Sequence, residues 1–177
     1  MVVKLWMVRH GETDWNANRR FQGWTDVVLT DTGRDQARRL AESLAGVRFD
    51  SVWSSDLSRA VETARLAYSE PKADHRLREL NFGDLEGAVW DDLTPSVQAE
   101  LAAFDGFTAP GGESIREFKA RVLEFLDALP AGDHLVVTHG GVIRMVRREC
   151  GSDGFPGHAD VVVLDWTNRA RVDDVGA

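Results

Sequence analysis

The stretch LWMVRHGETDWN (Leu5–Asn16) begins as an apolar run and stops abruptly at Arg9, His10 and Gly11. The residues Val2–Arg9 are mostly apolar, which predicts a strand buried on both faces of a sheet. A strand that ends in arginine, histidine and glycine passes from core to surface within three residues. In an open α/β sheet, ligands bind at strand ends of this kind. We therefore expect a ligand site at the end of this strand.

A second apolar run, HLVVTHGG (residues 134–141), also ends in a histidine followed by glycine. If the two strands are parallel neighbours, His10 and His139 face one pocket. Glycine at each strand end lets the backbone turn sharply and present N–H groups to a ligand. The Gly140-Gly141 pair also opens a helix, whose N-terminus favours an anion.

The rest of the chain alternates between helical and strand patterns. Thr30 or Asp31 is expected to cap the first helix, Ser55 or Asp56 the second, and a Ser114–Glu117 capping box opens the third. The alternation predicts a single α/β domain over residues 1–177, a three-layer α/β/α sandwich with a mostly parallel central sheet. The expected helices are 29–46, 56–69, 114–129 and 142–149, and the further strands are 51–55 and 160–166.

Composition restricts the classes of function. The net charge of −8 argues against a nucleic-acid surface, and the apolar runs are too short to span a membrane. A single cysteine, Cys150, excludes an internal disulfide framework and fits a reducing compartment, so we expect a cytoplasmic protein. The histidines and the cysteine lack metal-ligand spacing, so we expect no metal and no cofactor, although a carboxylate-only magnesium site stays open. The oligomeric state is left open.

Seven blocks of the sequence, in order, resemble the histidine phosphatase superfamily, the phosphoglycerate-mutase-like family with an RHG motif. One departure is Glu62, where such proteins usually carry glutamine. The resemblance covers Leu5 to about Arg147. Its blocks are RHGETDWN (9–16), FQGWTD (21–26), LTDTGRDQA (29–37), SSDLSRAVETA (54–64), LRELNFGDLEG (77–87), PGGES (110–114) and VTHGGVIR (137–144).

Phosphoryl transfer without a metal needs a nucleophile, fixed cations or donors, and a proton donor. We expect His10 to be the nucleophile, because neutral imidazole can form a phosphohistidine near pH 7. Its other ring nitrogen should donate to a backbone carbonyl. Arg9 and Arg59 are the expected guanidinium clamps, and His139 is expected to stabilise the developing charge.

Glu79 is the expected acid and base, and partial burial must keep its proton. The resemblance places this acid at the first glutamate of LRELNFG, so the rival Glu86 is expected to be structural.

Weaker expectations concern other residues of these blocks and the remaining histidines. The resemblance implies that Asn16 donates its amide to the phosphate, with Gln22, Gly23 and Gly140 as further contacts. Trp15 and Trp24 either line the mouth of the pocket or pack. Three histidines and the cysteine lie outside the motifs and are expected to have no catalytic role, the cysteine being a small buried hydrophobe. These are His75, His134, His158 and Cys150.

Residues 88–112 are less regular and are expected to cover the pocket. They contain no lysine or arginine and four acidic residues, whereas Trp90, Phe104 and Phe107 offer apolar surface. A mutase needs extra cations for a carboxylate, so the segment favours a phosphatase. Chain length and PGGES resemble the branch with α-ribazole phosphatase and broad-specificity phosphatases, which makes α-ribazole 5'-phosphate a candidate substrate. A cofactor-dependent phosphoglycerate mutase and a non-catalytic phospholigand-binding or regulatory protein remain alternatives.

Overall fold

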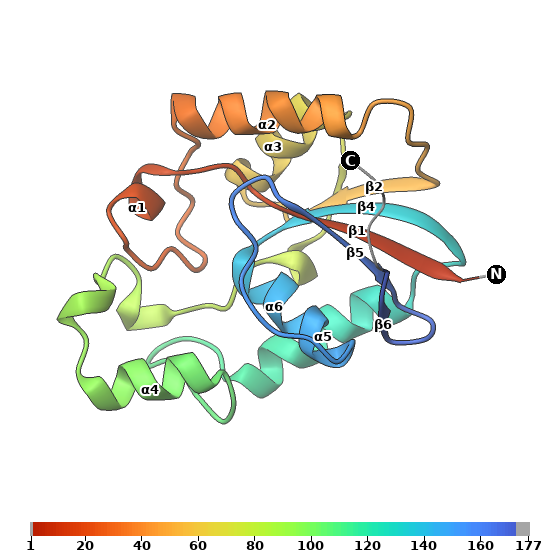
Figure 1. The fold of residues 1–177 in the computed structure, drawn as a ribbon. Coiled ribbons are helices and arrows are strands. Elements are labelled where there is room, and N and C mark those ends of the chain that lie inside the picture. The colour runs from red at the N-terminus through yellow and green to blue at the C-terminus, as the bar shows by residue number, and fades with distance from the viewer. Residues whose placement is uncertain (1, 173–177) are drawn as a thin grey trace.

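A six-stranded sheet forms the centre of the protein in the computed structural model, which describes residues 2–172 (Figure 1). The first four strands of the sheet are mutually parallel, and the last two run antiparallel to their neighbours. In sheet order the strands are β3 (Lys72–Ala73), β2 (Ser51–Ser54), β4 (Gly132–Thr138), β1 (Val3–Arg9), β5 (Val161–Asp165) and β6 (Ala170–Arg171).

Helices cover both faces of this sheet, as Figure 1 shows. Alternate residues of β1 point to opposite faces. Leu5 and Met7 join the core under one pair of helices, and Trp6 and Val8 join the core under the other pair. The predicted three-layer α/β/α sandwich is therefore confirmed. The first pair is α5 (Ile115–Asp127) and α6 (Gly140–Glu149), and the second pair is α2 (Asp31–Ser43) and α3 (Ser58–Ala67).

Two of the three expected helix caps are present. The Thr30 hydroxyl accepts from the third residue of α2, and Ser114 and Glu117 form the capping box of α5. The cap expected for α3 at Ser55 or Asp56 is wrong. That helix begins at Ser58, whose backbone N–H donates to the Asp26 carboxylate at 2.9 Å, so a distant loop satisfies the first turn.

The segment 88–112 is more ordered than its sequence predicts. It contains a 3₁₀ turn (Trp90–Asp92) and helix α4 (Pro95–Ala103), which begins after the Thr94 cap. The helix was missed because its apolar residues are mostly alanines without a clear stripe. Leu101 and Phe104 are buried in the core that α5 covers, so this segment is packed against the domain.

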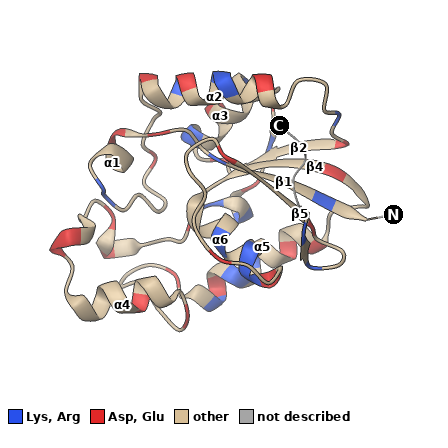
Figure 2. Ribbon diagram, viewed as in Figure 1, with Lys and Arg blue, Asp and Glu red and all other residues tan. Residues whose placement is uncertain are grey.

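Charged residues of both signs alternate along the outer faces of α2 and α5 (Figure 2). The expected lack of a nucleic-acid partner stays a prediction. None of the helices within residues 2–172 is long and apolar enough to cross a membrane. Short elements complete the described chain: α1 (Asp14–Ala17) and two 3₁₀ turns, His75–Leu77 and Gly83–Leu85.

Candidate active site

The two histidines that follow β1 and β4 lie side by side. These strands are parallel neighbours, with Arg9 in register with Thr138, so His10 and His139 leave the sheet at the same edge. Their ring centroids are 5.1 Å apart at an interplanar angle of 62°, and both side chains are buried. The structure thus brings together the two imidazoles that the sequence singled out.

The tautomer of His10 is fixed by its neighbour. Its Nδ1 lies 2.7 Å from the carbonyl oxygen of Gly11, which can only accept, so Nδ1 carries the proton and Nε2 carries the lone pair. Burial lowers the pKa of His10 well below its ordinary value, and the positive charges of Arg59 and Arg9 lower it further. The ring is therefore neutral at pH 7, as a nucleophile must be.

The loop after His10 is held by close backbone packing. A Cβ atom at Gly11 would clash with the carbonyl oxygen of Gly33, the third residue of α2, so a larger residue does not fit. The Gly11 N–H donates to the Thr63 hydroxyl at 3.0 Å, and that hydroxyl donates to the carbonyl of Arg59 at 2.7 Å. Helix α3 and the loop after His10 are therefore coupled by one buried hydroxyl.

Arg59 lies almost wholly within the protein, with 1% of its surface exposed. Its guanidinium donates to the carbonyls of Thr25, at 2.9 Å, and Gly23, at 2.8 Å. Burial lowers the pKa of Arg59 to about 10, so this guanidinium remains charged at neutral pH, and burial also lowers the pKa of Arg9. Arg9 donates to the carbonyl of Pro156 at 3.0 Å.

Four buried nitrogens of this cluster find no hydrogen-bond partner among the described residues. They are Nε of Arg9, Nε of Arg59 and both ring nitrogens of His139. A buried donor left unpaired costs about 1–3 kcal/mol, so donors of this kind are kept for a ligand. Burial, followed by the charge of Arg59, lowers the pKa of His139 well below its ordinary value. The cluster has the chemistry of an anion site around Nε2 of His10.

Glu79 reaches the same site from the segment before the 3₁₀ turn Gly83–Leu85. Its carboxylate accepts from the backbone N–H groups of Gly141 and Leu80, each at 2.9 Å. Burial raises the pKa of Glu79 above its ordinary value, against the opposing effect of these bonds and of the two arginines. A Cβ at Gly141 would clash with the carboxylate, so this glycine permits the close approach.

Glu86 binds a neighbouring loop. Its carboxylate accepts from the backbone N–H groups of Trp24 and Thr25, each at 2.8 Å, and from the Thr25 hydroxyl. It therefore holds the loop whose carbonyls hold Arg59. This geometry agrees with the structural role expected for Glu86.

Arg121 of α5 is a positioning residue that the sequence did not reveal. It donates to the carbonyls of Arg76, Arg78 and Glu79 at 2.7–2.8 Å, and it pairs with both oxygens of Glu113. Glu113 also accepts from the backbone N–H of Asn81, which follows Glu79 in the same segment. From sequence, Arg121 is indistinguishable from a solvated helix arginine. In the structure it fixes the backbone that carries Glu79.

The two expected amide contacts are oriented by Thr13. The side-chain oxygen of Asn16 accepts from the backbone N–H of Thr13 at 3.1 Å. The side-chain oxygen of Gln22 accepts from the Thr13 hydroxyl at 2.8 Å. Both amide nitrogens are thereby turned away from Thr13 and available to a ligand.

The two expected glycine contacts lie against the arginines. The Gly23 carbonyl accepts from Arg59 at 2.8 Å. A Cβ at Gly140 would lie 3.5 Å from Nε of Arg9 and 3.2 Å from the Phe155 ring, so the lack of a side chain lets the guanidinium reach the start of α6. Their expected phosphate contacts stay predictions.

His158 lies beside the site, although the sequence analysis set it apart. Its ring centroid is 6.2 Å from that of His10, and its Nε2 is buried without a partner from the described residues. Burial and the charge of Arg9 lower the pKa of His158 to about 4. The loop folds back because the Ala159 N–H donates to the Arg9 carbonyl at 2.9 Å. The expected lack of a catalytic role stays a prediction.

The other histidines, the cysteine and one tryptophan have structural surroundings. His75 is exposed, whereas His134 is buried and bonded to Ser51 and the Pro130 carbonyl. Cys150 is buried within the core. The indole N–H of Trp24 donates to the Glu79 carbonyl at 2.9 Å, so this tryptophan packs beneath the site.

A cavity of about 590 Å³ opens beside Glu79 and Gly141. Trp90 and Phe104 of the expected cover segment line it, but Phe107 is buried in the core instead. The segment brings no cation to the cavity, as expected, yet α6 supplies Arg144, which the sequence analysis missed. The remaining lining consists of Phe21, Phe82, Leu101, Ala102, Asp153, Gly154 and Phe155.

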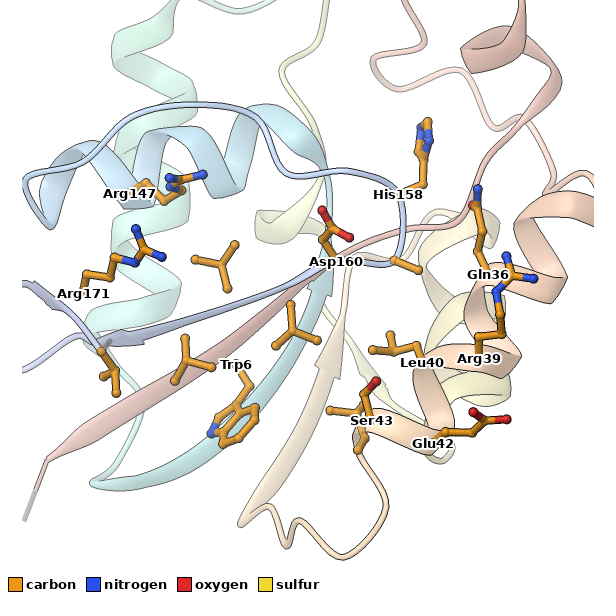
Figure 3. A pocket seen from close by; sticks show the side chains of 16 residues that line it. Trp6, Gln36, Arg39, Leu40, Glu42, Ser43, Arg147, His158, Asp160 and Arg171 are labelled. Atoms are coloured by element: carbon orange, nitrogen blue, oxygen red, sulfur yellow. The ribbon is translucent and has the colours of Figure 1, made fainter. Parts of the chain in front are cut away.

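A second cavity, of about 830 Å³, lies on the flank of the sheet between α2 and β5 (Figure 3). Trp6 and Leu40 contribute to its apolar floor, and Arg39 and Arg171 stand around it. His158 is at one end of this cavity, which otherwise contains none of the residues that gather around His10.

Comparisons with known proteins find one family and several relatives that this chain resembles. The model of the histidine phosphatase superfamily (branch 1) matches residues 5–162. Phosphoglycerate mutase-like protein 4 of Arabidopsis thaliana is 41% identical over 159 residues, covering 80% of this chain and 68% of that protein. The probable phosphoglycerate mutase GpmB of Yersinia pestis (strain Pestoides F) is 36% identical over 171 residues, covering 90% and 79%. The crystal structure of a phosphoglycerate mutase from Thermus thermophilus has a TM-score of 0.89 and 46% identity, covering 96% of each chain.

Proposed function

The chain belongs to the histidine phosphatase superfamily, and we propose that it is a metal-independent phosphomonoesterase that works through a phosphohistidine at His10. The observation that carries the proposal is the ring of buried, unpaired donors around a neutral imidazole. Arg9, Arg59 and His139 supply those donors, and Glu79 lies within the same cluster. Such an arrangement suits a tetrahedral phosphoryl group with charge spread over three oxygens.

In the first half of the reaction, Nε2 of His10 attacks phosphorus and the bond from phosphorus to the ester oxygen breaks. The guanidinium groups and the His139 ring hold the equatorial oxygens, where charge gathers in the transition state. Glu79 gives its proton to the departing oxygen, which leaves as an alcohol. A general acid of this kind contributes about 10²–10⁴-fold to the rate.

In the second half, water attacks the phosphohistidine. The Glu79 carboxylate takes a proton from that water as the phosphorus–nitrogen bond breaks, and inorganic phosphate is released. His10 returns to the neutral form with its proton on Nδ1. The raised pKa of Glu79 suits both roles, because a carboxyl with a higher pKa keeps its proton more readily and is a stronger base once the proton has been given up.

The cavity beside Glu79 favours a phosphatase over a mutase. One relative is named a phosphoglycerate mutase, a second a probable phosphoglycerate mutase and a third a phosphoglycerate mutase-like protein. A mutase must hold a carboxylate beside the phosphate, whereas this cavity is walled by Phe21, Phe82, Trp90 and Leu101. We propose a small phosphate ester with an uncharged, aromatic remainder, such as α-ribazole 5'-phosphate, as the substrate. The buried, unpaired Cys150 supports the cytoplasm as its compartment.

The test is covalent labelling followed by a substrate panel. Incubation with a ³²P-labelled aryl phosphate and rapid quenching should trap an acid-labile label in the protein. His10→Ala should abolish this label, whereas His75→Ala, which removes an exposed histidine, should retain it. Tight phosphate binding without labelling or turnover would instead favour a non-catalytic phospholigand-binding protein.

Steady-state rates on α-ribazole phosphate, phosphoglycerates and p-nitrophenyl phosphate then separate the remaining alternatives. A preference for α-ribazole phosphate supports the proposed substrate, and equal rates on unrelated esters remove it. Interconversion of phosphoglycerates that depends on 2,3-bisphosphoglycerate would identify a mutase.

A further inference from the structure

The cavity beside Glu79 contains a charged pair that the catalytic steps do not use. Within residues 2–172, the charged side chains of its lining are Glu79, Arg144 and Asp153. Nε of Arg144 donates to one carboxylate oxygen of Asp153 at 2.7 Å, and Nη2 lies 3.3 Å from the other. The cavity therefore holds a cation that is already neutralised.

Arg144 is held in place by more than this partner. Its guanidinium carbon lies over the rings of Phe104 and Phe155, 5.1 and 4.9 Å from their centroids. Nη2 also donates to the Ala102 carbonyl at 2.8 Å, and only 9% of the residue is exposed. The aromatic rings and the carbonyl would keep the guanidinium facing the cavity if the carboxylate were removed.

Asp153 is strongly stabilised as an anion. It accepts from Arg148 at 2.8 and 3.0 Å and from the Gly154 N–H at 2.6 Å, in addition to Arg144. The hydrogen bonds from the two arginines hold the pKa of Asp153 well below its usual range. Arg148 itself is directed toward the carbonyls of Ala103 and Phe104 and does not line the cavity.

We propose that Asp153 determines specificity by masking Arg144, so that the cavity admits leaving groups without a charge and rejects those that carry a carboxylate. This inference rests on the proposed phosphatase function and names the residue that sets its substrate class. An incoming carboxylate would meet a guanidinium whose Nε–Nη2 edge already binds Asp153, and the negative charge of Asp153 would repel it. An aromatic leaving group loses nothing, because the surrounding walls are aromatic and apolar.

The experiment compares two esters that differ by one carboxylate, phenyl phosphate and 4-carboxyphenyl phosphate. We expect the wild-type protein to prefer phenyl phosphate in kcat/KM by at least tenfold. Asp153→Asn keeps the size of the side chain and frees the charge of Arg144. Since a hydrogen bond to a charged group contributes about 1.5–3 kcal/mol, the ratio should shift toward the carboxylated ester by about 10- to 100-fold.

Two further variants separate charge masking from a general disturbance. In Arg144→Met/Asp153→Asn the freed cation is absent, so the shift should vanish while phenyl phosphate is still hydrolysed. Arg148→Gln removes the outer partner of Asp153 and should not weaken the discrimination. Circular dichroism and thermal melting establish that each variant is folded.

Two results overturn the inference: equal wild-type rates on both esters, or an unchanged ratio in folded Asp153→Asn. If the wild-type protein hydrolyses neither ester, the proposed function is overturned instead. In that case, calorimetric binding of benzylphosphonate and 4-carboxybenzylphosphonate to the wild-type protein and to Asp153→Asn decides, and Asp153→Ser replaces Asp153→Asn if that variant does not fold. A wild-type preference of at least tenfold for benzylphosphonate that the Asp153 variant loses supports masking, and equal ratios in the two proteins refute it.

Discussion

Replacing Glu79 by glutamine should slow the enzyme by an amount that depends on the leaving group. The variant keeps the length of the side chain but has no proton to give to the departing oxygen. For a poor leaving group such as an alkyl alcohol, the loss should approach the full contribution of a general acid, about 10²–10⁴-fold. p-Nitrophenolate departs without a proton, so its phosphoryl transfer to His10 should slow by about tenfold or less.

The structure separates this chemical effect from a structural one. Both oxygens of Glu79 accept from backbone N–H groups, so the amide nitrogen of the introduced glutamine must face one of those donors. An unsatisfied buried group costs about 1–3 kcal/mol and should lower the melting temperature. Any displacement of His10 that follows slows both esters alike. The difference between the esters therefore measures the lost proton.

The assay is a rapid-quench measurement of the first phosphorylation of His10 with a butyl ester and with p-nitrophenyl phosphate. Glu86→Gln is the matched control, because it changes a carboxylate that holds the Trp24–Thr25 loop and should slow both esters by one factor. Equal losses on both esters in Glu79→Gln would refute the assignment of Glu79 as the acid. A leaving-group dependence in Glu86→Gln would transfer the role to that residue.

Three other outcomes follow from the same site. On an alkyl ester, kcat/KM corrected for substrate ionisation should rise as His10 loses its proton below pH 6.5 and fall as Glu79 loses its proton above pH 4.5; a rising limb above pH 6.5 or a falling limb below pH 4.5 contradicts these shifts. Arg59→Lys keeps a charge but loses the planar fork, so kcat should drop on the order of 10²-fold in steady-state assays, with Arg65→Lys unchanged. Thr63→Val leaves the buried Gly11 N–H without its hydroxyl partner, so urea titration should give a free energy of unfolding lower by about 1–3 kcal/mol; a loss below about 0.5 kcal/mol argues against the coupling.

Much of the fold could be predicted because its strands and helices carry strong, regular patterns. The alternation in β1 places Leu5 and Met7 on one face and Trp6 and Val8 on the other, and this pattern is visible in the sequence. Helix α4 was missed because an alanine-rich segment has no distinct apolar stripe. The start of α3 was misplaced because its first turn is satisfied by Asp26, which local sequence does not identify as a partner.

In the site, too, residues with a local sequence signal could be predicted, and residues placed by distant contacts could not. His10 and His139 stand out because each ends an apolar strand, a property that two short stretches of sequence display. Arg121, Arg144 and His158 do not stand out, because the contacts that place them at the site involve residues distant in the sequence. The approach of His158 to His10 depends on a loop that returns to the end of β1. The periodicity of the sequence does not indicate that the loop returns there.

The central pairing of β1 with β4 has a consequence for how the protein is made. The ribosome releases His10 directly after β1, but β4, which brings His139 beside it, follows only after α5. Until then both edges of β1 lack their partners, because β5 follows later still, and long-range parallel pairing of this kind forms slowly. A nascent or truncated chain that lacks β4 therefore cannot bring His139 beside His10.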